Sequence, residues 1–308
     1  MFGFQQPQRN TGEILKKIFL SKTVISRLLL INAIVFVVVG LINVFMFISG
    51  MDSSSATANP IVRLLALPSD LSSLAVKPWT LFTYMFLHES FFHALVNLFM
   101  LYIGGIIFLE YLNEKKLLWT YILGGLMGAL FFVVAFNIFP VFNSVKEYSV
   151  LLGASASGLA ILIAIATYVP DYTIQMIFIG RVKLKYVAIV FVVIDVLSLP
   201  YGNAGGHIGH LGGAFWGFIY AYYLRKGSDF YKVFDGLNMP NFGGKTRQAK
   251  FDTYRQADRR PMDDDTYNQK RAATQEEIDK ILDKISKAGY DSLSKEEKEL
   301  LFKSSKKG

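Results

Sequence analysis

The sequence predicts an all-α, polytopic membrane protein: a bundle of six transmembrane helices with a small helical tail on the cytoplasmic side. Two observations predict this fold class. The 308 residues are 52% hydrophobic and have a mean hydropathy of +0.35. Charge is also distributed unevenly, because residues 1–224 carry 13 Lys/Arg and 9 Asp/Glu, whereas the remaining 84 carry 19 and 15. A soluble enzyme with a single core would not separate apolar from charged residues in this way.

Six apolar segments are close to the length that a helix needs to cross a bilayer, roughly 20 residues for a core about 30 Å thick. The predicted spans are 28–48, 91–109, 117–139, 150–168, 186–199 and 206–224. The fifth is short, so we expect its helix to extend back past Lys183 and Lys185, whose ammonium groups can reach the headgroups. Segment 172–180 is apolar but too short to cross, which favours an interfacial position.

The first span could instead belong to a cleaved signal peptide, because the small-x-small sequence Ala56-Thr57-Ala58 follows it. Its apolar run is longer than the roughly 7–15 residues of a signal-peptide core. The polar stretch 49–55 also separates the run from the cleavage motif. We therefore interpret the segment as a retained span.

The distribution of Lys and Arg among the short loops predicts the orientation, since cytoplasmic loops are enriched in these residues. One side of the membrane carries Arg9, Lys16, Lys17, Lys22, Arg27, Lys115, Lys116, Arg181, Lys183, Lys185, Arg225 and Lys226. The other side has only Arg63, Lys77 and Lys146. Both termini are therefore expected in the cytoplasm, with 1–27 as an N-terminal segment and 28–227 as the membrane domain.

The C-terminal part predicts a flexible linker followed by a helical hairpin. Residues 228–273 contain Gly243-Gly244, Pro261 and three consecutive aspartates, and lack apolar periodicity. Within 274–308, Thr274 to Glu277 and Ser294 to Glu297 are two capping boxes, each followed by apolar residues at helical spacing. The hairpin is too small for a strong core of its own. Docking on a protein partner, docking on the membrane domain and a solvated tail all remain open.

Composition excludes several kinds of chemistry. The chain has no cysteine, so disulfides, thiolate metal sites and cysteine nucleophiles are excluded. Its net charge is +8, but the basic residues flank apolar segments and form no single stripe. This favours lipid headgroups over nucleic acid as the acidic neighbour.

Polar residues inside the predicted spans are functional candidates, because a polar group in hydrocarbon is costly unless it is satisfied. Asn97 follows His93 by four residues and so shares its helix face. Glu110 ends the second span and Asp195 lies within the fifth. Every histidine of the chain lies in or beside a span: His88, His93, His207 and His210.

Ser155 and His210 lie at matching depth, each near the outer end of its predicted span. A serine hydroxyl becomes a good nucleophile when a neutral imidazole takes its proton. The sixth span also repeats glycine every four residues on one face, which lets a neighbouring helix approach closely. These glycines are Gly205, Gly209, Gly213 and Gly217. If the fourth span is that neighbour, Ser155 and His210 can meet.

The combination of these motifs resembles the rhomboid intramembrane serine proteases over about residues 79–223. The motifs are Gly153-Ala154-Ser155-Ala156 in the fourth span, His93-x-x-x-Asn97 in the second, and Gly205-x-x-x-Gly209-His210-x-x-Gly213-x-x-x-Gly217 in the sixth. The resemblance implies a bacterial inner-membrane endopeptidase that cleaves transmembrane segments of other proteins without a metal or other cofactor.

The resemblance also implies a role for each residue. Ser155 would be the nucleophile and His210 the general base. The Ser155 backbone N–H and the side chains of His93 and Asn97 would stabilise the oxyanion. Gly153, Gly209, Gly213 and Gly217 would allow close helix packing at the site.

Several positions depart from the family pattern. Ala156 stands where glycine is usual, which makes Ser157 a rival nucleophile in a shifted register. We favour Ser155, because Gly153 precedes it by two residues as the pattern requires. Leu159 replaces an aromatic residue that would pack on the histidine, and Thr80 replaces an arginine that would anchor the external loop.

The other polar candidates have less demanding interpretations. We expect His207 at the rim of the site and His88 at the membrane interface. Asp195 could be a third catalytic acid, but we favour a hydrogen-bonding role within the bundle. Glu110 is expected to pair at a helix end in preference to acting as a catalytic acid. His207 and His210 have the spacing of two metal ligands but lack an accompanying metal motif, so no metal site is predicted. The alternative functions are an inactive rhomboid-like protein that binds transmembrane clients, and a transporter. The spans show no inverted repeat, which is unfavourable to the transporter.

Overall fold

The computed structural model describes residues 19–51, 59–176 and 179–234, and residues 281, 283–285, 293, 294 and 297 near the C-terminus. The chain divides into two compact units, Met1–Lys245 and Thr246–Gly308.

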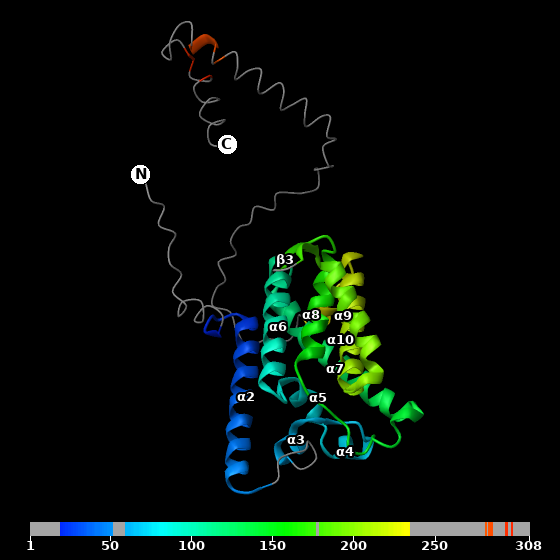
Figure 1. Ribbon diagram of the computed structural model, residues 1–308. Coiled ribbons are helices and arrows are strands. Elements are labelled where there is room, and N and C mark those ends of the chain that lie inside the picture. The colour runs from blue at the N-terminus through cyan, green and yellow to red at the C-terminus, as the bar shows by residue number, and fades with distance from the viewer. Residues whose placement is uncertain are drawn as a thin grey trace. The chain divides into compact units, whose positions relative to one another are not determined.

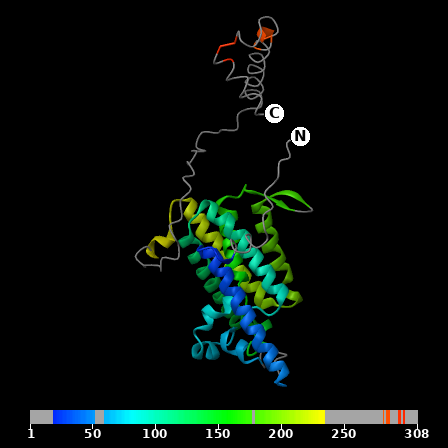
Figure 2. The same cartoon turned by 90° about the vertical axis from the view of Figure 1, so that its left-hand side faces the viewer.

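The first unit is a helical bundle. Figures 1 and 2 show its long helices side by side, with α2 along one edge. These helices are α2 (Val24–Ile48), α6 (Phe91–Tyr111), α7 (Glu114–Ile138), α8 (Ser155–Tyr168), α9 (Leu184–Ser198) and α10 (Ala204–Arg225). Among the described residues, four segments are long and apolar enough to cross a membrane: α2, α6, α7 and Leu184–Tyr201. The chain is therefore a multi-pass membrane protein.

Short elements cover the two ends of the bundle. Figure 1 shows α3, α4 and α5 at one end and β3 at the other. The short helices are α3 (Pro60–Leu65), α4 (Leu71–Val76), α5 (Thr80–Thr83), η1 (Tyr84–Phe86), η2 (Pro140–Phe142), η3 (Leu199–Tyr201) and η4 (Phe230–Phe234). The strands are β1 (Leu67–Pro68), β2 (Val150–Leu151), β3 (Thr173–Met176) and β4 (Gly180–Lys183).

Polar side chains determine where the first three long helices begin. Thr23, Ser90 and Asn113 each accept a hydrogen bond from the backbone N–H three residues further on, before α2, α6 and α7. This satisfies one of the N–H groups that the first turn of a helix leaves without a partner.

Helix α8 is the centre of the bundle. Its residues from Ala156 to Ala166 are all buried, and it packs against α6, α7, α9 and α10. A helix that is apolar and buried on every side is typical of the core of a large bundle. The outer helix α2 instead exposes many large apolar side chains, as expected of a helix that faces lipid.

The segment between α2 and α6 is held by hydrogen bonds to its own backbone. Trp79 Nε1 donates to the Leu64 carbonyl at 2.8 Å, and Thr83 Oγ1 donates to the Leu65 carbonyl at 2.6 Å. Thr80 is buried, and its hydroxyl donates to the Lys77 carbonyl at 2.7 Å. The anchor expected to be missing at Thr80 is thus replaced by local bonds.

The same segment also pairs with the chain just before α8. Strands β1 and β2 are antiparallel, with Leu67 opposite Leu151 and Pro68 opposite Val150. The predicted fourth span began at residue 150, but the helix begins at Ser155, because Val150–Leu151 forms this ladder.

The predicted backward extension of the fifth helix reaches past Lys185, as expected, but stops short of Lys183. Helix α9 begins at Leu184, because the preceding residues form β4, which pairs with β3 in an antiparallel hairpin. Lys183 and Lys185 both bind the Asp171 carboxylate, at 3.0 and 2.9 Å. These two hydrogen bonds lower the pKa of Asp171. The apolar segment 172–180 is therefore largely hairpin.

The described part of the first unit extends into the expected linker, as far as residue 234. Tyr231 of η4 is buried, and its hydroxyl accepts a hydrogen bond from Trp216 Nε1 at 3.0 Å. Asp229 pairs with Lys116 at 2.9 Å. Residues 235–273, which make up most of that expected linker, lie outside the described residues.

In the second unit, the capping box at Ser294 is present. Ser294 Oγ accepts from the Glu297 N–H at 3.2 Å, and the Ser294 N–H donates to the Glu297 carboxylate at 2.7 Å. Glu297 also pairs with Lys284, at 2.9 Å. The predicted capping box at Thr274 lies outside the described residues.

Candidate active site

Ser155 is the first residue of α8, and no side chain in the described part of the chain caps this end of the helix. The preceding residue, Ala154, has no side chain that could accept from the first N–H groups. These groups consequently stay available, and the N-terminus of a helix favours negative charge. Ser155 is partly exposed, in contrast to the buried residues that follow it.

The approach to Ser155 depends on Gly153. Its φ of +125° belongs to a conformation that L side chains rarely adopt, and its N–H donates to the Tyr84 carbonyl at 2.9 Å. A Cβ built on Gly153 would lie 3.1 Å from His93 Nε2 and 3.4 Å from Ser155 Oγ. The absence of a side chain thus lets the His93 ring and the Ser155 hydroxyl both approach Gly153.

Helix α10 packs against the same end of α8 through its glycines. A Cβ on Gly213 would fall 2.1 Å from the Ala156 carbonyl oxygen, and one on Gly217 would fall 2.2 Å from that of Ala160. Both pairs follow the same order along the two chains, so the helices run parallel. His210 precedes Gly213 by three residues and therefore shares this face, one turn towards the N-terminus.

The structure thus brings Ser155, His93 and the turn of α10 that carries His210 to one end of the bundle. No hydrogen bond between Ser155 and His210 occurs among the residues that the structure describes. Catalytic hydrogen bonds are often long before substrate binds.

Asn97 lies one turn beyond His93 on α6 and is buried. In the described part of the chain its Nδ2 has no hydrogen-bond partner. A buried amide without a hydrogen-bond partner is costly. This N–H group is therefore a candidate donor to a bound group that is present only during a reaction.

The comparisons with known proteins identify two regions of the chain. Residues 75–227 match the Rhomboid domain family, and residues 263–307 match a family of unknown function, DUF6576. The chain carries a rhomboid domain. The resemblance expected from the motifs is confirmed, over nearly the same residues. A comparison with curated proteins gave no match.

Within the rhomboid domain, Ser157 differs from Ser155 in its surroundings. Ser157 is fully buried, and its Oγ has no hydrogen-bond partner among the described residues. A Cβ built on Gly125 would lie 2.7 Å from this oxygen, so Ser157 faces α7. Ser155 is the partly exposed serine at this end of α8.

The sequence predicted that Asp195 forms hydrogen bonds within the bundle, but it did not identify the partners. The expectation that it hydrogen-bonds within the bundle is confirmed. Its Oδ1 lies 2.8 Å from Nδ1 of His207 and 2.8 Å from Nδ1 of His210. The partners could not be predicted, because α9 and α10 were not aligned by any motif. The available signal was a carboxylate inside an apolar run.

The same three side chains are the one described group of histidine and carboxylate residues able to hold a metal ion, with ligand atoms within 4.8 Å of one another. The separations of 2.8 Å are those of hydrogen bonds. His207 is partly exposed, consistent with a place at the rim.

His88, which was expected at the membrane interface, is buried among protein side chains. It lies between η1 and α6, where its ring packs edge-on against His93 with centroids 5.6 Å apart. Phe36 of α2 covers it in a second edge-on contact. Glu110 is exposed at the end of α6, near Tyr172, the pKa of whose hydroxyl is raised by burial and by this carboxylate.

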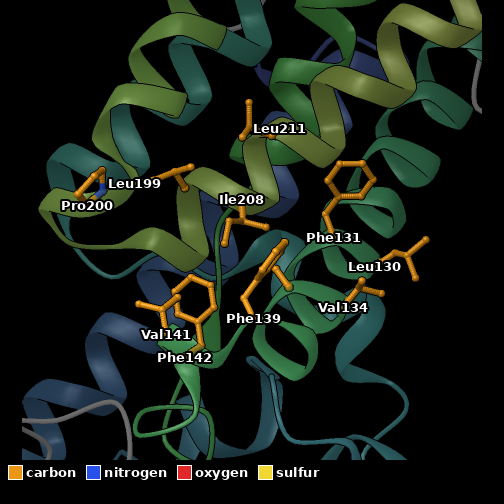
Figure 3. A pocket seen from close by; sticks show the side chains of 11 residues that line it. Leu130, Phe131, Val134, Phe139, Val141, Phe142, Leu199, Pro200, Ile208 and Leu211 are labelled. Atoms are coloured by element: carbon orange, nitrogen blue, oxygen red, sulfur yellow. The ribbon is translucent and has the colours of Figure 1, made fainter.

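A pocket of about 710 Å³ lies beside α10, but none of its lining side chains can act as a nucleophile, an acid or a base. Figure 3 shows that apolar side chains from α7, η2, η3 and α10 surround it. The lining contains no ionisable group, so it suits an acyl chain or an apolar side chain. Its lining residues are Leu130, Phe131, Val134, Ala135, Phe139, Val141, Phe142, Leu199, Pro200, Ile208 and Leu211.

Proposed function

We propose that this rhomboid domain is an intramembrane serine endopeptidase that cleaves transmembrane segments of other membrane proteins. One observation carries the proposal. Ser155 opens an uncapped helix beside His93, and the next residue packs on Gly213 of α10, one turn after His210. A nucleophile, a base and an anion-stabilising helix end therefore occur at one end of the bundle.

The chemistry follows from these groups. Ser155 Oγ attacks the scissile carbonyl carbon while its proton passes to His210. The oxyanion that forms accepts hydrogen bonds from the Ser155 N–H, His93 and Asn97. As the C–N bond breaks, His210 returns the proton to the leaving amine. Water then attacks the acyl-enzyme in the same way and releases Ser155.

The proposal includes six crossings, with both termini in the cytoplasm of a bacterial cell and the domain in its inner membrane. Four segments meet the length and hydropathy requirement for a membrane span. Helices α8 and α10 would be the other two crossings. Helix α8 is only 14 residues long, but it is buried among other helices and does not need to span the bilayer against lipid. The bias of Lys and Arg supports the orientation.

The test compares two serines on the same helix. Ser155→Ala should abolish cleavage of a model single-pass substrate and labelling by a fluorophosphonate probe, because the nucleophile is lost. Ser157→Ala should keep both, because that serine faces α7. Labelling that persists in Ser155→Ala and disappears in Ser157→Ala would move the nucleophile, and an unlabelled wild type would contradict the proposal.

A second candidate is an inactive rhomboid-like protein that binds transmembrane clients. It is favoured by the missing hydrogen bond between Ser155 and His210 among the described residues. It predicts no probe labelling, together with client capture that Ser155→Ala does not change.

A further inference from the structure

Asp195 is the one buried carboxylate among the residues that the structure describes. It lies on α9, about one turn before the helix ends at Ser198, among apolar side chains. Burial of a carboxylate is costly unless hydrogen bonds compensate it. The compensation here comes from α10.

Both compensating groups are imidazoles, and both use the same nitrogen. His207 Nδ1 and His210 Nδ1 each lie 2.8 Å from Asp195 Oδ1. A carboxylate accepts, so each Nδ1 carries a hydrogen. The proton of a neutral His210 therefore resides on Nδ1, and Nε2 keeps its lone pair.

We propose that Asp195 is a positioning residue for His210, which makes the site a serine, histidine and aspartate contributed by α8, α10 and α9. The proposal rests on the proposed function and deepens it, because the motifs indicated a pair of residues without an acid. Asp195 holds the imidazole ring in one orientation and in the tautomer whose Nε2 can accept a proton.

The proton of Ser155 moves to His210 Nε2 as the bond from Oγ to the carbonyl carbon forms. The imidazolium then carries its positive charge next to the Asp195 carboxylate, which stays ionised and takes no proton. The proton leaves from Nε2 to the amine when the C–N bond breaks.

His207 offers a matched control, because it makes the other hydrogen bond to the same oxygen. Its removal leaves the bond between Asp195 and His210 in place. If Asp195 had only a structural role, loss of its hydrogen bond to His207 would have the same effect as loss of its hydrogen bond to His210. If Asp195 positions His210, only the hydrogen bond to His210 affects kcat.

The experiment uses the full-length chain in lipid nanodiscs. Asp195→Asn should lower kcat by at least about 10²-fold with KM nearly unchanged, because the amide no longer stabilises the imidazolium or dictates the tautomer. His207→Gln should keep kcat within a small factor. Thermal unfolding of both variants checks that they fold.

A second measurement does not depend on cleavage or on the folding of Asp195→Asn. In ¹⁵N NMR of the wild type at mildly alkaline pH, where imidazole is neutral, His210 should be the tautomer with hydrogen on Nδ1. The signal is assigned by its loss in His210→Gln.

Three results would overturn the proposal. They are hydrogen on Nε2 of His210, unchanged kcat in folded Asp195→Asn, and activity that EDTA abolishes and Zn²⁺ restores, since Asp195 would then be a metal ligand. If the wild type is labelled at Ser155, these results leave the proposed function intact. An unlabelled wild type would refute the proposed function, and the positioning role with it.

Discussion

The α-carbon of Gly213 lies so close to Ala156 that a Cβ built on it would fall 2.1 Å from the Ala156 carbonyl oxygen. Real contacts never reach that distance, so the two backbones touch with no side chain between them. Ala156 follows Ser155, and Gly213 follows His210 by one turn. This contact therefore determines how far the serine lies from the histidine.

Replacement of Gly213 by alanine should damage both stability and activity. The added methyl group meets backbone and cannot be accommodated by a rotamer change, so we expect a loss of about 3 kcal/mol or more in the free energy of unfolding. Gly40→Ala on α2 is the matched control, because nothing lies within 4 Å of its Cβ position. Unfolding in detergent and a cleavage assay measure the two effects. Equal stability of the two variants would contradict the close packing.

Gly153→Ala should lower kcat/KM by at least about 10²-fold, because the new methyl group would lie 3.1 Å from His93 Nε2 and displace the ring. Gly180→Ala is the control that separates the effect of backbone strain from the effect of displacing the His93 ring. Gly180 also has a positive φ, of +84°, but its Cβ position is open. Strain alone costs about 1–3 kcal/mol and should leave cleavage unchanged. A similar loss of activity in both variants would remove His93 from the site.

Asn97→Ala should reduce kcat by about 10²–10³-fold with little change in KM, as expected for a lost oxyanion donor. The control is Asn137→Ala on α7, whose amide donates to the Ser69 and Val133 carbonyls at 2.8 Å. That variant should lose about 1–2 kcal/mol of stability and keep its kcat. An Asn97 variant that is only less stable, with full kcat, would assign Asn97 a packing role.

Asp70, the N-cap of α4, should titrate far below its ordinary range. Hydrogen bonds from the Ser72 hydroxyl and the Ser73 N–H lower the pKa of Asp70 from 3.8 to about 2. Because the folded pKa is depressed, the stability that the ionised cap contributes is complete above about pH 4 and is lost as the pH falls through about 2.

The NMR shift of the Ser73 amide, followed against pH, should therefore have its midpoint near 2. Ser72→Ala should raise this midpoint towards 3.8, and Asp70→Asn should abolish the transition while the cap remains. A wild-type midpoint at 3.8 would show that the cap is not formed in solution.

The apolar segments predicted the fold class because hydrophobic length is a property of the chain itself. Their ends were less predictable. Val150–Leu151 is apolar enough to extend a helix, yet it pairs with β1, and the residues before Leu184 form a hairpin. A strand of two residues depends on a partner some eighty positions away, which no local pattern contains.

The candidate site, like the helix ends, was predicted only in part. The motifs identified Ser155, His210, His93 and Asn97, since polar groups in an apolar helix stand out. The surroundings of Ser157 did not follow from its spacing, because which α8 face meets α7 depends on how glycines such as Gly125 let the helices approach.

What the sequence by itself determined is the set of membrane helices and the polar residues they carry, because both depend on residue type and local spacing. Only the tertiary structure decided that Asp195 meets His207 and His210 and that His88 is buried beneath Phe36. Hydrogen bonds between helices depend on the relative rotation of the helices, and that rotation is determined by packing over their whole length.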